Sequence, residues 1–200
     1  MNLIIDIGNT LAKLVVFEAN KPIAEIHTSN HTLEALPDVI RRYPAVRHGI
    51  VSTVMDLSPE AQHCLRQLPF VPLMLSSQTP VPLRIAYHTP HTLGADRLAA
   101  AVGATTLQPG RDLLVIDAGT CVTYEFVDHT GCYRGGNISP GLEMRLAALH
   151  EHTARLPLIN PDGDTPDVGY DTATAIRAGV IRGIRHEIEG YIRTFREKIP

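Results

Sequence analysis

Short runs of aliphatic residues separated by polar turns open the chain and predict alternating strands and helices. Pro37 weakens the first helical pattern, whereas Ser58, Pro59 and Glu60 supply a hydroxyl cap, a first-position proline and a first-turn acid for the second. The first part of the chain therefore predicts a mixed α/β unit. We expect strands over residues 2–7, 11–18, 22–28, 48–54, 72–75 and 83–87, and helices over 33–42, from Ser58 onward, and over 93–107.

The same pattern restarts after Gln108-Pro109-Gly110, the clearest break in the chain. Apolar residues then recur every four positions from Ile176 to Ile192, which predicts one long amphipathic helix at the end. We expect two related α/β domains, residues 1–109 and 110–200, that meet at a cleft. The second should contain strands over 113–116, 121–127 and 131–138, a helix over 140–153, a loop rich in Pro, Asp and Gly over 160–169, and the long helix over 171–198.

Each half carries an Asp-Gly-Thr string at the end of its first strand. The first string, Asp6-Ile7-Gly8-Asn9-Thr10, has one residue more than the second, Asp117-Ala118-Gly119-Thr120. Glycine lets a backbone approach a ligand closely, and exposed turn amides form a concavity suited to phosphate oxygens. One such string is also compatible with an ordinary hairpin turn. Two of them, each opening a similar unit, favour a nucleotide-binding cleft.

An aspartate lies at the end of each first strand, Asp6 in one half and Asp117 in the other. Its carboxylate would repel phosphate unless a cation stood between the carboxylate and the phosphate. Mg²⁺ is the usual mediator, because it keeps several of its waters and binds through few carboxylates. Lys13 lies three residues after Thr10 and could add a positive charge. The strings are therefore compatible with a bound magnesium nucleotide.

Composition favours a small ligand. The chain has 18 basic and 21 acidic residues, a net charge of −3 and a pI near 6.3, so we expect neither a nucleic-acid nor a membrane partner. The three cysteines form no Cys-x-x-Cys pair, and no apolar run reaches the ~18 residues of a membrane span. His150 and His152 do not share a helix face, and we expect no zinc site. These features indicate a cytoplasmic protein.

Several longer motifs occur together and in order. They are DIGNTLAKLVVF, Tyr87 followed by LGADR, DAGTCVTYEFV, GGNISPG and TATAIRAG. With these motifs the chain resembles, over almost its whole length, the type III pantothenate kinases, sometimes labelled Bvg accessory factor family proteins. The resemblance implies two related ribonuclease-H-like domains of the actin-like ATPase type around a nucleotide cleft. It also implies a homodimer that phosphorylates pantothenate with ATP, the first step of coenzyme A biosynthesis.

The resemblance implies site residues as well. It assigns ATP to Asp6, Ile7, Gly8, Asn9, Thr10, Leu11, Ala12, Lys13 and Thr120. It assigns pantothenate to Tyr87, Gly94, Ala95, Asp96, Arg97 and Thr172. Asp96 would accept the proton of the pantothenate hydroxyl. Asp6 would hold Mg²⁺ through water, and Asp117 would bind a monovalent cation, K⁺ or NH₄⁺.

Taken one at a time, these residues have simpler interpretations. Asp96 also suits an ordinary first-turn acid, which stabilises a helix by about 0.3–1 kcal/mol. Arg97 could bind the pantothenate carboxylate or pair with an acid in the protein, and Tyr87 could be a packed strand residue. Gly179 and Gly183, four residues apart, permit close packing by a neighbour within the chain or by a second subunit.

Two departures from the family pattern stand out. Glu125 occupies a position where the family more often has aspartate, and it could still serve a hydrogen bond or a water-mediated cation contact. Family members also continue beyond the long helix, so the second domain is expected to lack its last strand and helix, which would weaken nucleotide binding.

Two other functions remain open at this point. The fold could serve a non-catalytic regulatory or accessory protein, although three cleft carboxylates, Asp6, Asp96 and Asp117, have no evident use in a scaffold. It could also serve a kinase or phosphatase acting on another small alcohol. Assays with a panel of alcohols in place of pantothenate would distinguish an enzyme for another small alcohol from a pantothenate kinase.

Overall fold

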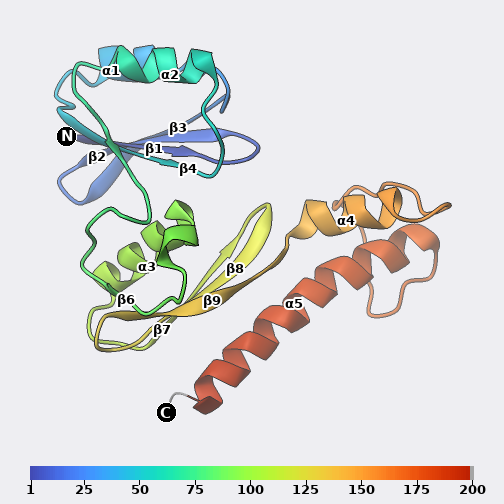
Figure 1. The fold of residues 1–200 in the computed structure, drawn as a ribbon. Coiled ribbons are helices and arrows are strands. Elements are labelled where there is room, and N and C mark those ends of the chain that lie inside the picture. The colour runs from blue at the N-terminus through green and yellow to red at the C-terminus, as the bar shows by residue number, and fades with distance from the viewer. Residues whose placement is uncertain (199–200) are drawn as a thin grey trace. The chain divides into compact units, whose positions relative to one another are not determined.

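A computed structural model describes residues 1–198, which form two compact units (Figure 1). Unit 1 comprises Met1–Pro82 and His88–Ala99, and unit 2 comprises Leu83–Tyr87 and the chain from Ala100 onward. None of the helices within residues 1–198 is both long and apolar enough to cross a membrane.

Unit 1 is built on a five-stranded sheet with the order β3-β2-β1-β4-β5. The first three strands form an antiparallel meander, and β4 and β5 continue the sheet parallel to β1. The strands are β1 (Asn2–Ile7), β2 (Ala12–Glu18), β3 (Lys21–Thr28), β4 (His48–Thr53) and β5 (Leu73–Met74).

One face of this sheet is covered by helices α1 (Leu36–Arg42) and α2 (Pro59–Arg66), as Figure 1 shows. Alternate residues of β1 and β2 are fully buried against them, because side chains one residue apart on a strand point to opposite faces. Asp6, between Ile5 and Ile7, is therefore on the face away from this core.

Unit 2 contains a four-stranded sheet with the order β6-β9-β8-β7. Its strands are β6 (Arg84–Ile85), β7 (Leu113–Ala118), β8 (Cys121–Val127) and β9 (Cys132–Pro140), and its helices are α4 (Leu142–Glu151) and α5 (Thr172–Lys198). Strands β7, β8 and β9 repeat the antiparallel meander of unit 1. The predicted apolar stripe of α5 is confirmed, since Ile176, Val180 and Ile184 pack with Leu146 of α4.

Most predicted elements are present with ends shifted by at most two residues, and two elements differ more from the prediction. The first helix begins at Leu36 instead of residue 33, because Leu33 has a left-handed backbone (φ 51°) while its N–H donates to Ser29 O. Pro37 consequently lies in the first turn, where a helix tolerates proline. A short 3-10 helix at Pro90–Thr92 was not predicted, and it precedes α3 (Ala95–Leu107), which begins in unit 1 and ends in unit 2.

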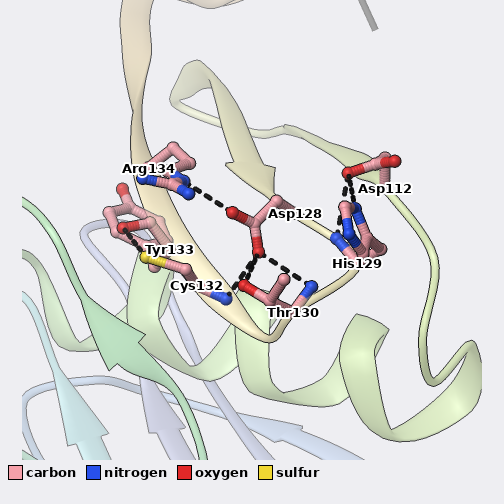
Figure 2. Close-up of polar contacts among 7 residues, drawn as sticks. All are labelled: Asp112, Asp128, His129, Thr130, Cys132, Tyr133 and Arg134. Carbon is pink, nitrogen blue, oxygen red and sulfur yellow. Dashed lines mark hydrogen bonds and ion pairs between the residues drawn. The ribbon is translucent and has the colours of Figure 1, made fainter. Parts of the chain in front are cut away.

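The turn between β8 and β9 is organised by Asp128 (Figure 2). One carboxylate oxygen accepts hydrogen bonds from the Thr130 hydroxyl (2.6 Å), Thr130 N (2.9 Å) and Cys132 N (3.0 Å), and the other accepts from Arg134 Nε (2.6 Å). The side chain is 9% exposed. These donors, led by the Thr130 hydroxyl, hold the pKa of Asp128 well below its usual range despite its burial.

We expect the protein to lose stability as the pH falls below about 4, the ordinary pKa of an unfolded aspartate. The folded pKa of Asp128 is lowered, so its contribution is complete above the unfolded pKa and is lost as the pH falls toward the folded one. Denaturant unfolding at pH 5, 4 and 3 should show a shallower loss for Asp128→Asn than for the parent. Asp38→Asn, which removes an exposed partner of Arg41, is the matched control and should keep the parental slope. Identical slopes for parent and Asp128→Asn would contradict the assignment.

Candidate active site

The two Asp-Gly-Thr strings form loops of the same kind, each joining the first two strands of a meander. In unit 1, Ile7 pairs with Ala12 and the Gly8 N–H donates to Leu11 O at 3.0 Å. In unit 2, Ala118 pairs with Val122 and the Gly119 N–H donates to Cys121 O at 2.9 Å. The extra residue of the first string is thus accommodated inside its loop.

Asp6 and Lys13 are opposite each other on β1 and β2, directly before and after the first loop. Directly opposed residues on antiparallel strands share one face, so the two side chains lie on the same side of the sheet. Asn9, Thr10 and Lys13 are exposed and Asp6 is half-buried. The loop therefore presents a carboxylate, an ammonium group and two polar side chains outside the core of unit 1.

Asn30, a residue that was not selected from the sequence, is buried and contacts the same loop. Its side-chain Nδ2 donates to Gly8 O at 3.0 Å and to Asn9 O at 2.9 Å, and Met55 Sδ lies 3.5 Å from the same nitrogen. Because these contacts span more than 20 positions in sequence, no local motif could have indicated them.

A pocket of about 650 Å³ lies in unit 1 beside this loop. Its walls come from the end of β4 (Thr53 to Asp56), from Leu75 to Ser77, from His91 and from Leu93 to Ala95. Strand β4 pairs with β1 in parallel, and Val54 N donates to Ile7 O at 3.4 Å. The loop over residues 8–11, which we call the phosphate-loop candidate, is consequently a neighbour of the pocket wall at the carboxyl ends of β1 and β4.

Asp96 lies in the first turn of α3, half-buried, next to two pocket residues. Its Oδ1 occupies the space that a Cβ on Gly94 would need, so the carboxylate lies directly against Gly94. Arg97, the next residue, is 7% exposed. Gly94 and Ala95 of the segment predicted to bind pantothenate therefore line the pocket, and the Asp96 carboxylate lies against Gly94.

The remaining predicted substrate residues belong to unit 2. The Tyr87 ring packs edge-on against Tyr133 with centroids 6.1 Å apart, and it lies near Gly135 of β9. Thr172 is exposed at the start of α5, where Asp171 caps the helix by accepting from Thr174 N at 2.7 Å. Capping thus falls to Asp171, which leaves Thr172 for another role.

The second loop is held in place by Gly141, which precedes α4. The Gly141 N–H donates to Thr120 O at 3.0 Å, and a Cβ at Gly141 would overlap Gly119 O and lie 2.5 Å from Thr120 O. The GGNISPG motif therefore serves as a backbone support for Thr120, a residue predicted to bind ATP.

A polar cluster around Glu187 connects the end of β9, which precedes Gly141, to α5. Its carboxylate accepts from the Tyr124 hydroxyl (2.9 Å), the Ser139 hydroxyl and Arg145 Nη2, and Arg145 Nε donates to Pro140 O at 2.7 Å. Burial, followed by the bond to Glu187, raises the pKa of Tyr124 to about 12. Burial opposes ionisation of Glu187, but its three donors outweigh that effect and lower its pKa. The cluster keeps the carboxylate charged and the strand end fixed.

The two acids of β7 and β8 have different surroundings. Asp117 is exposed near the end of β7. Glu125 is fully buried and accepts a hydrogen bond from the Tyr133 hydroxyl. For Glu125 the sequence was compatible with a hydrogen bond or a water-mediated cation contact, and the structure shows the hydrogen bond.

The carboxylates of the candidate site suit a cation that water and phosphate oxygens mainly coordinate. Within residues 1–198, no group of three or more His, Cys, Asp or Glu side chains gathers into a metal site. An ion bound mainly by water and phosphate oxygens, as Mg²⁺ is in phosphotransferases, needs only one or two carboxylates. Asp6 beside the first loop satisfies that requirement.

Comparison with known proteins points to one family. A sequence model described as type III pantothenate kinase matches residues 2–194. Type III pantothenate kinases of Bacteroides fragilis and Phocaeicola vulgatus are 54% and 52% identical over 200 residues, which is 100% of this chain and 82% of each relative. The one from Porphyromonas gingivalis is 46% identical over 98% of this chain and 81% of its own length.

Among solved structures, a Baf family protein of Campylobacter jejuni, titled a transcriptional activator, aligns with a TM-score of 0.57. The alignment covers 94% of this chain and 78% of that one at 19% identity. At this identity the likeness concerns the fold alone. The expected class, two related α/β domains of the actin-like type, is confirmed.

Proposed function

This chain belongs to the type III pantothenate kinases, and we propose how its residues carry out the phosphorylation of pantothenate by ATP. Phosphoryl transfer asks a protein mainly for positioning and charge stabilisation. One observation supports the proposal above all. In unit 1 the pocket bordered by Gly94 and Ala95 adjoins, through β4, the loop that follows Asp6.

For ATP, we assign the phosphates to the segment Asp6–Lys13 and a further nucleotide contact to Thr120. The exposed loop amides and Lys13 favour negative charge, and Asp6 offers a full negative charge to the waters of Mg²⁺. Bound Mg²⁺ would neutralise charge on the phosphates. Asp6 itself orients that hydration shell, and Lys13, opposite it on β2, offsets its repulsion of phosphate.

For pantothenate, we assign Asp96 as the group that orients the hydroxyl and accepts its proton late in the transfer. Gly94 and Ala95 line the pocket of unit 1, and Arg97 follows Asp96 on α3. The family motifs assign Tyr87 and Thr172 of unit 2 to pantothenate as well.

A homodimer is part of the proposal. Thr172 lines an apolar groove of about 1130 Å³ between α4 and α5, together with Met144, Leu149 and Gly179. Apart from its two chain neighbours and the adjacent backbone of α5, no described heavy atom lies within 4 Å of the Cβ that Gly179 lacks, so a second copy could approach α5 closely. Light scattering of the purified protein measures the expected two-chain mass.

We expect turnover to require K⁺ or NH₄⁺ and to fall by about fivefold or more in Na⁺, equivalent to about 1 kcal/mol in the barrier. Asp117, exposed at the end of β7, supplies the proposed carboxylate ligand. Proteins separate K⁺ from the smaller Na⁺ by the size and the coordinating dipoles of a site. Equal turnover after replacing KCl by NaCl at constant ionic strength would contradict this role.

The test of the whole proposal is ADP release with and without pantothenate, in the presence of Mg²⁺ and K⁺. Release that depends on pantothenate is expected. Release with a different small alcohol only would indicate another kinase of this fold, and the lack of any release would favour an accessory protein. The reaction is proposed for the cytoplasm, where reducing conditions suit the free thiols of Cys64, Cys121 and Cys132.

A further inference from the structure

Asn30 contacts the backbone of the phosphate-loop candidate through its side-chain amide. The residue follows β3, and it is 5% exposed. Both hydrogens of its Nδ2 are used, one on Gly8 O (3.0 Å) and one on Asn9 O (2.9 Å). A buried amide that lost these acceptors would carry an uncompensated desolvation cost, so the contact is strongly specified.

These two bonds determine which way the neighbouring N–H groups face. The described peptide bonds are trans, and in a trans peptide the C=O of one residue and the N–H of the next point in opposite directions. Gly8 O and Asn9 O both point toward Asn30. The N–H groups of Asn9 and Thr10 therefore point away from Asn30.

These two successive N–H groups have the arrangement that binds anions. Asn9 and Thr10 are exposed, and within residues 1–198 neither N–H donates to another residue. Adjacent backbone amides that face one side form a concavity for phosphate oxygens. The Gly8 N–H, in contrast, is already engaged by Leu11 O at 3.0 Å, so Asn30 selects which amides remain for a ligand.

The same amide also lies near a residue of the pocket wall. Met55, whose Sδ lies 3.5 Å from Asn30 Nδ2, is one of the residues that line the 650 Å³ pocket of unit 1. Asn30 itself is not among the described residues that line the pocket, and a thioether sulfur is a weak acceptor, so the two bonds to the loop proposed for ATP are its main contacts.

We infer that Asn30 is a positioning residue, which fixes the peptide planes of Gly8–Thr10 so that two backbone amides receive the ATP phosphates. The inference rests on the proposed function, because it takes that loop as the phosphate site. Asn30 itself touches no substrate in this account.

The test compares MgATP binding, measured by titration calorimetry without pantothenate, in the parent, Asn30→Ala, Asn30→Asp and Thr28→Val. Asn30→Asp keeps the side-chain shape but replaces the donor with a carboxylate that the two carbonyls repel. Thr28→Val is the matched control, since Thr28 is also buried nearby but its hydroxyl serves Ala35 N and not the loop.

Both Asn30 variants should raise the Kd and the KM for MgATP by about fivefold, the worth of one typical hydrogen bond. The KM for pantothenate should change less than twofold, and Thr28→Val should leave the MgATP constants at parental values. A merely structural Asn30 would alter melting without this split between the two substrates.

A second measurement needs no variant. In the NMR spectrum of the unsubstituted protein, the amides of Asn9 and Thr10 should shift on addition of MgATP more than the amide of Gly8. Two outcomes would overturn the role of Asn30 but leave the proposed nucleotide site standing. One is a folded Asn30 variant that binds MgATP as the parent does. The other is a parent that binds MgATP without a shift of the Asn9 and Thr10 amides. An unsubstituted protein that binds no MgATP would overturn the proposed nucleotide site, and the inference with it.

Discussion

Asp96→Asn should lower the turnover of pantothenate phosphorylation by about 10²–10⁴-fold, the usual contribution of a positioned general base. The amide keeps the shape of the carboxylate but cannot take up the hydroxyl proton. The carboxylate lies against Gly94 in the pocket wall, so the substitution changes chemistry more than shape. The KM for pantothenate should therefore change little, and steady-state kinetics at saturating ATP measure both constants.

The alternative role of Asp96, a first-turn acid of α3, makes a different prediction. Its loss would then cost about 0.3–1 kcal/mol of stability and leave turnover intact. Glu60→Gln is the matched control, because Glu60 is the first-turn acid of α2, and we expect it to lower stability slightly without affecting turnover. An Asp96→Asn enzyme that behaves like Glu60→Gln would refute the catalytic assignment.

Much of the fold could be predicted because its elements follow local rules. Strand β1 was predicted over residues 2–7 and spans Asn2–Ile7, and α2 begins at Pro59 after the predicted Ser58 cap, whose hydroxyl accepts from Ala61 N at 3.0 Å. The repeated string predicted a turn in each unit, and in both loops the glycine N–H closes the turn, on Leu11 O in the first and on Cys121 O in the second. Aliphatic runs, caps and turns are encoded within a few residues, so the sequence reveals them.

The missed features depend on contacts between distant residues. Asn30 is an unremarkable polar residue until the fold brings it to Gly8 and Asn9. Likewise, Glu187 was not selected from the sequence of the long helix, whereas the Tyr124 hydroxyl and Arg145 Nη2 both donate to its carboxylate. The left-handed Leu33 arises from its burial and its bond to Ser29 O, against its local preference. Asn30 and Glu187 support the two loops through contacts between distant residues, and no spacing rule identifies them.

Gly141→Ala should destabilise the protein by about 3 kcal/mol, the upper end of the range for overpacking, and lower its melting temperature by about 6–12 °C. The backbone of Gly141 (φ −76°, ψ −176°) suits any residue, so the added methyl group acts only through contact. That methyl would overlap Gly119 O and lie 2.5 Å from Thr120 O. Backbone atoms cannot rotate aside as a side chain can, so the loop before β8 must move, and the KM for ATP should rise as Thr120 is displaced.

Gly103→Ala is the matched control, with the opposite expected sign. Gly103 is an exposed residue inside α3. Apart from its two chain neighbours and the adjacent helix backbone, no described heavy atom lies within 4 Å of its missing Cβ. Alanine there should stabilise the helix by up to about 1 kcal/mol and leave the KM for ATP unchanged. Differential scanning calorimetry and ATP titrations of both variants measure the contrast. If Gly141→Ala has the melting temperature and the KM for ATP of the parent, the contact between Gly141 and the Gly119–Thr120 backbone does not position the second loop.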